Sequence, residues 1–283
     1  LEDDHNTNCP EEMERNGVNV VYGFAGLKIH AKLCFVVRRE KGKLERYTHI
    51  GSGNYNAASA KIYTDLGLFT ANKDINDDVQ DLFNVMTGYG VVNHYRKLLV
   101  SPHTLRPGIT KLIRREIEQH KKHGNGHIII KCNQLVDYEM VKVLYEASRA
   151  GVKIECIVRG ICSLRPGLPG VSDTITVRSI VGRLLEHARI YYFHNNGDEE
   201  MYFGSADLMT RNLNGRIEVL TPLLQENLCN NVMNQIVIPQ LKDNIHAWVM
   251  NSDGSYTKLQ PKKDETVYDS QEEIAKKLNL MKK

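Results

Sequence analysis

The chain has 283 residues, of which 41% are hydrophobic, and a formal net charge of +3. This length predicts roughly two domains, and the apolar content argues against disorder. The small net charge argues against nucleic-acid binding, and no apolar run is long enough to span a membrane. Six cysteines without a CxxC pair indicate neither a zinc site nor a disulfide framework, so we expect reduced thiols in a cytoplasmic protein.

The first half predicts an α/β unit. The opening LEDDHNTNCPEEMERNG resembles the interior of a longer sequence rather than a signal peptide, so we expect a fragment. ERNGVNVVYG (14–23) indicates a helix end, a glycine C-cap and a strand. GLKIHAKLCFVVRRE (26–40) is a strand headed by His30 and Lys32, and the turn GSGN (51–54) precedes another strand, DLGLFT (65–70). A helix, INDDVQDLFNVMTGYG (75–90), ends the unit.

The second half adds a helix (109–124), a strand (127–132) and a helix (137–150) before it repeats that order. SRAGVKIECIVRG (148–160) again gives a helix end, a glycine and a strand, followed by a loop of turn formers (160–174) that we expect over a site. His187 and Arg189 then head a strand, GSAD (204–207) forms the turn, and RIEVLT (216–221) is the last matching strand. A long helix is predicted over 227–250 and a loosely held polar tail over 261–283.

The shared order of these features indicates an internal duplication. The distance from histidine to glycine is also similar, 21 residues from His30 to Gly51 and 17 from His187 to Gly204. We therefore predict an α/β fold of two tandem modules with mixed sheets flanked by helices. The first module covers residues 1–100 and is truncated at its N-terminus, and the second covers 101–283.

The paired polar residues suit phosphoryl chemistry. Alternation along a strand places His30 beside Lys32, and His187 beside Arg189, on one face. A histidine can attack phosphorus or donate a proton, while the neighbouring cation binds non-bridging oxygens. Glycine-serine turns can bring backbone N–H groups close to an anion.

The turn residues Asn54 and Asp207 can each orient the opposing imidazole through its second nitrogen. If the modules pack about a pseudo-twofold axis, the two histidines meet at one cleft. One histidine then attacks phosphorus, and the other protonates the leaving group.

The duplicated His-x-basic and Gly-Ser pattern resembles the phospholipase D superfamily, and more closely the bacterial polyphosphate kinases that act through a phosphohistidine. The similarity spans about Gly17 to Leu224 through GLKIHAK, RYTHIGSGNYNAASAKIYTDLGLFT, KCNQLVD, IVRGICSL, LEHARIYYFHNNGDEEMYFGSADLMTRNL and RIEV. The resemblance implies that the chain comprises the two C-terminal catalytic domains. The family's arginine for Mg²⁺ would precede residue 1, so we predict no metal ligand here.

The resemblance also implies roles for individual residues. His30 is the phosphorylated residue, and His187 is the second catalytic histidine, a proton donor and nucleotide contact. Tyr63 and Arg159 match ATP-binding positions, and His49 has a supporting role. Lys32, Arg189, Asn54 and Asp207 are further expected contacts of the bound phosphates. The implied substrates are ATP or ADP with Mg²⁺ and polyphosphate, and the longer protein is expected to self-associate and to have no transmembrane segment, with membrane association left open.

Two departures separate the chain from the wider superfamily. The usual aspartate, separated from the basic residue by four positions, is replaced by Val37 and His194, and the second lysine has become Arg189. These changes favour a kinase over the alternative, a phosphodiesterase that uses the same histidine pair. A third hypothesis is a catalytically incomplete fragment that binds nucleotide.

Overall fold

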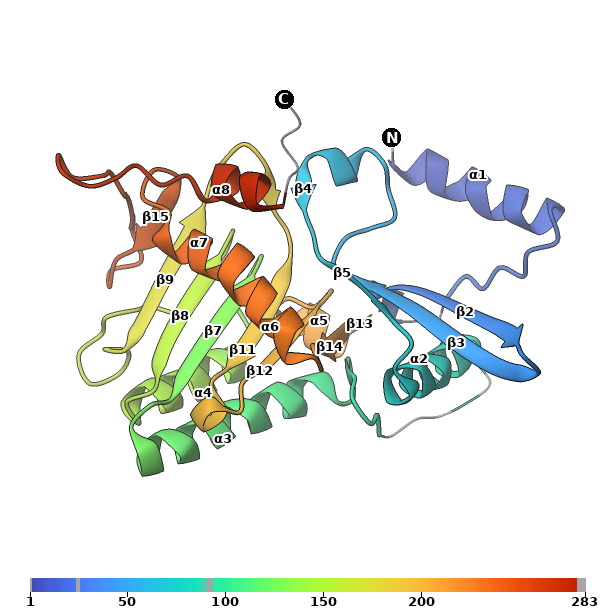
Figure 1. Ribbon diagram of the computed structural model, residues 1–283, viewed down its shortest axis with the longest axis horizontal. Coiled ribbons are helices and arrows are strands. Elements are labelled where there is room, and N and C mark those ends of the chain that lie inside the picture. The colour runs from blue at the N-terminus through green and yellow to red at the C-terminus, as the bar shows by residue number, and fades with distance from the viewer. Residues whose placement is uncertain (1, 24–25, 89, 91–93, 279–283) are drawn as a thin grey trace.

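The two halves of the sequence form two α/β parts that lie side by side (Figure 1). This computed structural model describes residues 2–23, 26–88, 90 and 94–278. The predicted α/β fold of two modules with mixed sheets and flanking helices is confirmed. No helix within the described ranges is long and apolar enough to cross a membrane.

The larger sheet belongs mainly to the second half and has nine strands in the described part of the chain. Strands β7, β8 and β9 run parallel, and the others are antiparallel to their neighbours. In spatial order the strands are β16 Tyr256–Lys258, β15 Ala247–Met250, β9 Ile175–Ile180, β8 Lys153–Val158, β7 His127–Cys132, β11 Arg189–Phe193, β12 Glu200–Gly204, β14 Val219–Pro222 and β6 Leu99–Val100. The edge strand β6 thus lies at the passage from the first half to the second.

The first half contributes a smaller antiparallel sheet, with spatial order β2 Lys32–Glu40, β3 Lys43–Gly51 and β5 Gly67–Thr70. Four short strands form two further parallel pairs, β1 Lys28–Ile29 with β13 Arg216–Ile217, and β4 Tyr63–Thr64 with β10 Leu185–Glu186. Each pair joins a strand of one half to a strand of the other. The strand end that precedes each histidine is therefore paired with a strand of the other half.

Helices cover both faces of the large sheet (Figure 1). Apolar residues of α3 and α4 pack with Ile128, Ile130 and Tyr191 on one face, and the segment around α6 and α7 packs with Ile129, Ile190 and Tyr192 on the other. The helices are α1 Glu2–Arg15, α2 Lys73–Met86, α3 Leu105–His123, α4 Tyr138–Arg149, α5 Thr210–Asn214, α6 Glu226–Val232, α7 Ile238–Lys242 and α8 Ser270–Lys277. A π-helical turn, Met233–Val237, connects α6 to α7, and 3₁₀ turns occupy Ser59–Lys61 and Asn195–Gly197.

Three predicted elements are wrong. Residues 18–22 form no strand, because the small sheet offers no neighbour comparable to β7 and β9, which enclose β8. The helix predicted over 227–250 ends at Lys242, because buried Asp243 accepts the N–H groups of Ile245, His246 and Ala247 in a turn, and β15 follows. Within the tail predicted over 261–283, α8 is packed rather than loosely held, because it buries Gln271 and Ala275, and residues 279–283 lie outside the described ranges.

Asp78 connects α2 to the segment that leaves the first half. Its buried carboxylate accepts the backbone N–H groups of Arg96, Lys97 and Leu98 at 2.9, 2.7 and 3.0 Å. We predict that Asp78→Ala lowers the free energy of unfolding by about 3 kcal/mol, because three N–H groups lose their acceptor. Chemical denaturation measures this loss. Asp81→Ala, which removes only a partly exposed ion pair with Arg96, should cost less than about 1 kcal/mol, and equal effects would contradict this role of Asp78.

Candidate active site

The exchanged strand pairs bring each histidine next to a carboxylate of the other half. The backbone N–H of Ala31 donates to the carbonyl of Ile217 at 3.0 Å, and that of Ala188 donates to the carbonyl of Thr64 at 2.9 Å. Glu218 follows Ile217 in the sequence, and Asp65 follows Thr64. The main chain therefore sets each imidazole beside an acidic side chain before any side-chain contact forms.

His30 is oriented by Glu218. Its Nδ1–H donates to the Glu218 carboxylate at 2.9 Å, and the Glu218 side chain is fully buried. Asn212 and, at 3.9 Å, Arg216 also approach this carboxylate. Because Nδ1 carries the proton, Nε2 of His30 keeps its lone pair, which is the arrangement a nucleophilic imidazole requires.

His187 is oriented in the same way by Asp65. Its Nδ1–H donates to Asp65 at 2.8 Å, and the Tyr63 ring lies against the imidazole with a centroid separation of 4.9 Å. Burial lowers the pKa of His187, with further lowering by Arg189 and Arg159, although the hydrogen bond to Asp65 opposes the shift. The ring is therefore neutral at pH 7 in this structure.

The two arrangements match residue by residue. Lys28 pairs with Arg216 as Leu185 pairs with Tyr63, so His30 corresponds to His187 and Glu218 to Asp65. Lys32 pairs with Gly51, and Arg189 with Gly204, in the same register. The duplication inferred from the sequence is thus present in the backbone pairing of the site.

Contacts cross between the two halves around Arg189. Arg189 Nη1 donates to the Ser52 carbonyl at 3.3 Å and lies 3.1 Å from Nε2 of His187. Ser52 in turn follows Gly51, the pairing partner of Lys32, and its hydroxyl donates to Asp65 at 2.6 Å. These contacts connect His187 to Lys32, which lies two residues after His30.

Lys32 and Arg189 are buried cations, exposed by only 6% and 4%. Burial lowers the pKa of Lys32 to about 8, with Arg189 and Arg216 lowering it further and Glu218 opposing them. Arg189 is held by Asp207 at 3.3 and 3.1 Å. Buried positive charge at the edge of a site favours an anionic ligand, which would replace the lost hydration.

The glycine-serine turns are bonded into the fold through their serines. Their serine N–H groups are already bonded, Ser52 to the Leu66 carbonyl at 2.9 Å and Ser205 to the Val219 carbonyl at 3.0 Å. At Gly53 an added Cβ would lie 2.1 Å from the Asp65 carboxylate. Gly53 therefore makes room for the Asp65 carboxylate.

The expectation that Asn54 and Asp207 orient the imidazoles is wrong. Asn54 is exposed and makes no side-chain hydrogen bond to a described residue, and Asp207 bonds to Arg189 and to the backbone N–H of Asn133. Asp65 and Glu218 do the orienting instead. They were recoverable from the sequence, because an acidic residue follows the turn serine by thirteen positions in both halves.

Tyr63 and Arg159 do lie with the second histidine. Arg159 follows β8 and donates to the carbonyl of Glu186 at 3.1 Å, and burial lowers its pKa. His49 lies on β3, where Nδ1 is 2.7 Å from the Tyr55 hydroxyl and the ring packs on Phe69. The arrangement shows no contact of His49 with either predicted catalytic histidine.

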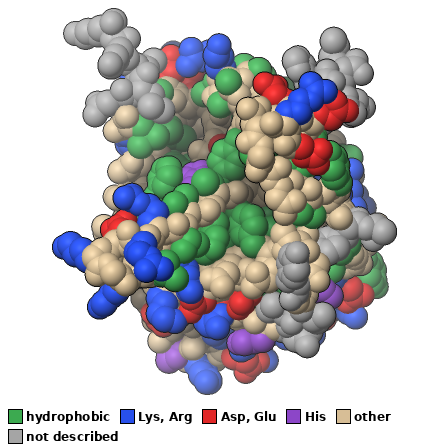
Figure 2. Space-filling model, turned by 90° about the vertical axis from the view of Figure 1, so that its right-hand side faces the viewer, with side chains coloured by type: hydrophobic (Ala, Val, Ile, Leu, Met, Phe, Trp, Pro, Cys, Tyr) green, Lys and Arg blue, Asp and Glu red, His purple; other side chains and the backbone are tan. Residues whose placement is uncertain are grey.

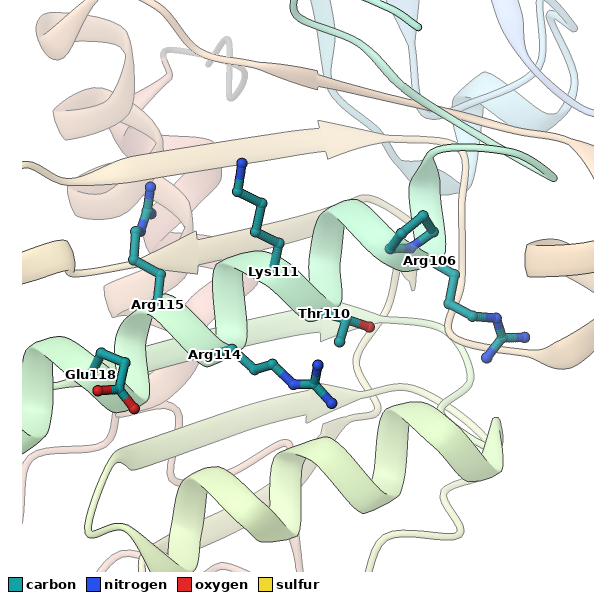
Figure 3. Close-up of a pocket in the computed structure, with 7 residues that line it drawn as sticks. Arg106, Thr110, Lys111, Arg114, Arg115 and Glu118 are labelled. Atoms are coloured by element: carbon teal, nitrogen blue, oxygen red, sulfur yellow. The ribbon is translucent and has the colours of Figure 1, made fainter. Parts of the chain in front are cut away.

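A hollow of about 570 Å³ lies along α3, and neither histidine lines it (Figure 3). Figure 3 shows its side chains projecting from the helix. Two of its arginines already form ion pairs, Arg106 with Asp137 and Arg115 with Glu200. The residues that line it are Arg106, Pro107, Thr110, Lys111, Arg114, Arg115 and Glu118. None of the predicted site residues is among them.

The residues of the site do not form a binding cage for a metal ion. In the described ranges, no group of three or more potential ligands comes together. Asp65 and Glu218 are each committed to a histidine, and Asp207 to Arg189. Mg²⁺ commonly reaches phosphate-transfer sites on nucleotide phosphates and keeps much of its own water.

The fold is a duplicated α/β architecture in which each histidine bonds to a carboxylate of the other half and precedes a buried cation by two residues. Residues 1–92 match the family described as polyphosphate kinase C-terminal domain 1, and residues 98–271 match polyphosphate kinase C-terminal domain 2. The chain therefore belongs to the polyphosphate kinase family.

Individual relatives agree with this assignment. A polyphosphate kinase of Prosthecochloris aestuarii is 52% identical over 259 residues, which is 92% of this chain and 36% of the relative. Polyphosphate kinase 1 of Chlorobaculum tepidum is 46% identical over the whole chain and 40% of its own length. The crystal structure of polyphosphate kinase from Porphyromonas gingivalis superposes with a TM-score of 0.89 at 39% identity, over 95% of this chain and 41% of that one. The chain thus spans well under half the length of these relatives.

Lys32 provides a direct test of the electrostatics of the site. We predict that its ammonium group loses its proton with a midpoint near pH 8, because burial disfavours the charged form. Lysine Nζ resonances followed by NMR between pH 6 and 11 measure the midpoint. A normal midpoint for Lys32 would contradict its burial in the site.

Proposed function

We propose that this chain is the catalytic region of a polyphosphate kinase that reversibly transfers the γ-phosphate of ATP to polyphosphate through a phosphohistidine at His30. The observation that carries the proposal is the hydrogen bond from Nδ1 of His30 to buried Glu218 at 2.9 Å. It leaves Nε2 as the nucleophile and places a negative charge where the imidazolium forms. The family assignment and the buried cations support the choice of a phosphorylated substrate.

The first step forms a bond between Nε2 of His30 and the γ-phosphorus. The bond from the γ-phosphorus to the bridging oxygen breaks, and its electron pair leaves with ADP. Lys32 and Arg189 balance the charge on the non-bridging oxygens, and Glu218 balances the positive imidazole. Tyr63 and Arg159 are the proposed nucleotide contacts beside His187.

In the second step a terminal oxygen of polyphosphate attacks the phosphorus and His30 leaves. One phosphoanhydride bond replaces another, so the overall transfer is close to isoenergetic and reversible. Mg²⁺ is proposed to arrive with ATP and to shield its phosphate charges.

His187 has a role that depends on the bound substrate. Without ligand it is neutral, and its Nε2 faces a donor on Arg189. Negative phosphates raise the pKa of a nearby histidine, which favours the protonated ring. His187 would then donate from Nε2 to the leaving oxygen of ADP, while Asp65 holds the Nδ1 proton.

Incubation with γ-³²P-labelled ATP and Mg²⁺ tests the proposal. We predict one acid-labile, base-stable label on His30, transferable to added polyphosphate, and no label in His30→Ala. Labelling of another residue would refute the assignment. Hydrolysis of a phosphodiester without ATP would instead select the phosphodiesterase hypothesis.

Because the chain spans only 36% of the Prosthecochloris relative, the labelling experiment has a third outcome. ATP binding without labelling would indicate a catalytically incomplete region. The same labelling experiment on the intact protein then distinguishes an incomplete region from a wrong assignment.

The exchange of carboxylates gives a sharper prediction. Glu218→Gln should slow labelling of His30 by about 10- to 100-fold, because the amide cannot balance the imidazolium charge. Quenched-flow labelling measures the rate constant. Glu226→Gln, an exposed change in the same half, should leave the rate unaltered. A normal rate in Glu218→Gln would show that the carboxylate of the second half does not serve the histidine of the first.

A further inference from the structure

The short strand β10, which directly precedes His187, is held in place by the buried carboxylate of Glu186. Glu186 is 2% exposed and lies on the face of the chain opposite His187. Its carboxylate accepts hydrogen bonds from Lys131 at 2.9 Å, Gln240 at 2.7 Å and Thr64 at 3.0 Å. Burial tends to raise the pKa of Glu186, but Lys131 and the other donors outweigh it and lower the pKa. The anchor is therefore a charged, fully bonded group.

Gln271 of α8 completes this anchor and extends it along the main chain. Its Nε2 donates to the Glu186 carboxylate at 2.8 Å and to the Leu184 carbonyl at 2.8 Å. Its Oε1 accepts the N–H of Leu184 at 2.9 Å. The side-chain amide thus pairs with Leu184 as a neighbouring strand would. The fit is close, because a Cβ added at Gly182 would lie 2.6 Å from Gln271.

The helix that presents Gln271 is itself fixed at its first turn. The Asp269 side chain caps α8 by accepting the N–H groups of Gln271 and Glu272 at 2.9 and 3.0 Å. The N–H of Ser270 donates to buried Asp243 at 2.9 Å. Capping and burial at this end mean that Gln271 is held in place before it contacts β10. In Figure 1, α8 lies beside the region of β4, the partner of β10.

The first half has no equivalent anchor. By the strand register, the position of Glu186 corresponds to Ile29, which is 37% exposed. Ile29 instead borders an open groove of about 380 Å³, lined also by Val21, Leu33 and Phe83. Figure 2 shows hydrophobic side chains gathered on this side of the molecule. The polar anchor is thus a feature added to only one of two duplicated strands, the one before His187.

We infer that Gln271 is a positioning residue for His187, and that α8 is a structural part of the catalytic site. Gln271 fixes Leu184 and Glu186, and two groups of the site depend on that segment. His187 follows directly and bonds to Asp65 at 2.8 Å, and the Glu186 carbonyl holds Arg159 at 3.1 Å. The catalytic consequence rests on the proposed function, whereas the positioning itself does not.

Hydrogen exchange in Gln271→Leu tests the positioning without any turnover. The loss of three hydrogen bonds should speed exchange of the Leu184 N–H and of the His187 Nδ1–H by about tenfold or more, measured by NMR. Glu272→Ala, the adjacent exposed position on α8, should leave both rates unchanged. Faster exchange at Leu184 with an unchanged His187 proton would overturn the inference.

Kinetics on the intact protein provide the second readout. Gln271→Leu should lower kcat about tenfold with KM for ATP within about twofold, because a displaced ring affects transfer more than binding. If Gln271→Leu does not fold, Gln271→Glu provides the test, because it keeps the acceptor for the Leu184 N–H but repels Glu186. Faster exchange of the His187 Nδ1–H is then expected. Should the unmodified protein transfer no phosphate, the proposed function fails while the exchange result still decides the positioning. Normal kcat with faster His187 exchange would overturn the catalytic part.

Discussion

Two hydrogen bonds between an imidazole and a carboxylate, each crossing from one half of the chain to the other, are the constraint on which this site depends. His30 requires Glu218, and His187 requires Asp65. Because Glu218 is fully buried, its charge needs partners, and separation of the halves would leave it unpaired. The two cross-half hydrogen bonds therefore contribute both to the stability of the fold and to the orientation of the histidines, and neither half alone contains both partners of either bond.

The two halves have the same backbone register around the histidines but differ in their side chains. Equivalent registers place a histidine, a cation and a carboxylate in both halves. The cation is lysine in one half and arginine in the other, and burial lowers the pKa of Lys32 to about 8. Behind the two strands the surroundings differ most, with an apolar groove beside Ile29 and a polar anchor around Glu186. Such differences can give two similar histidines unequal tasks.

The sequence predicts the elements of the fold better than the partners within the site. Local patterns suffice for α2, α3, β7 and α4, and for the strands headed by His30 and His187. The shared spacing from the turn serine marks the two orienting carboxylates, but which histidine each one contacts depends on residues 122 and 188 positions apart, which the spacing does not give. The packing of α8 is not predictable from the sequence, because the helix is polar in composition and is held largely by Gln271 and an Asp269 cap. Long-range hydrogen bonds, rather than hydrophobic periodicity, decide these features.

The central claim is that both histidines act on one phosphorus atom, each oriented by the other half. A crystal structure of the intact protein with ADP and orthovanadate, a mimic of the transferred phosphoryl group, tests it most directly. The account predicts one vanadium bound to Nε2 of His30, with Nε2 of His187 directed at the same group and both carboxylate contacts retained. Vanadate bound at His187 alone, or two separate vanadates with one at each histidine, would contradict it.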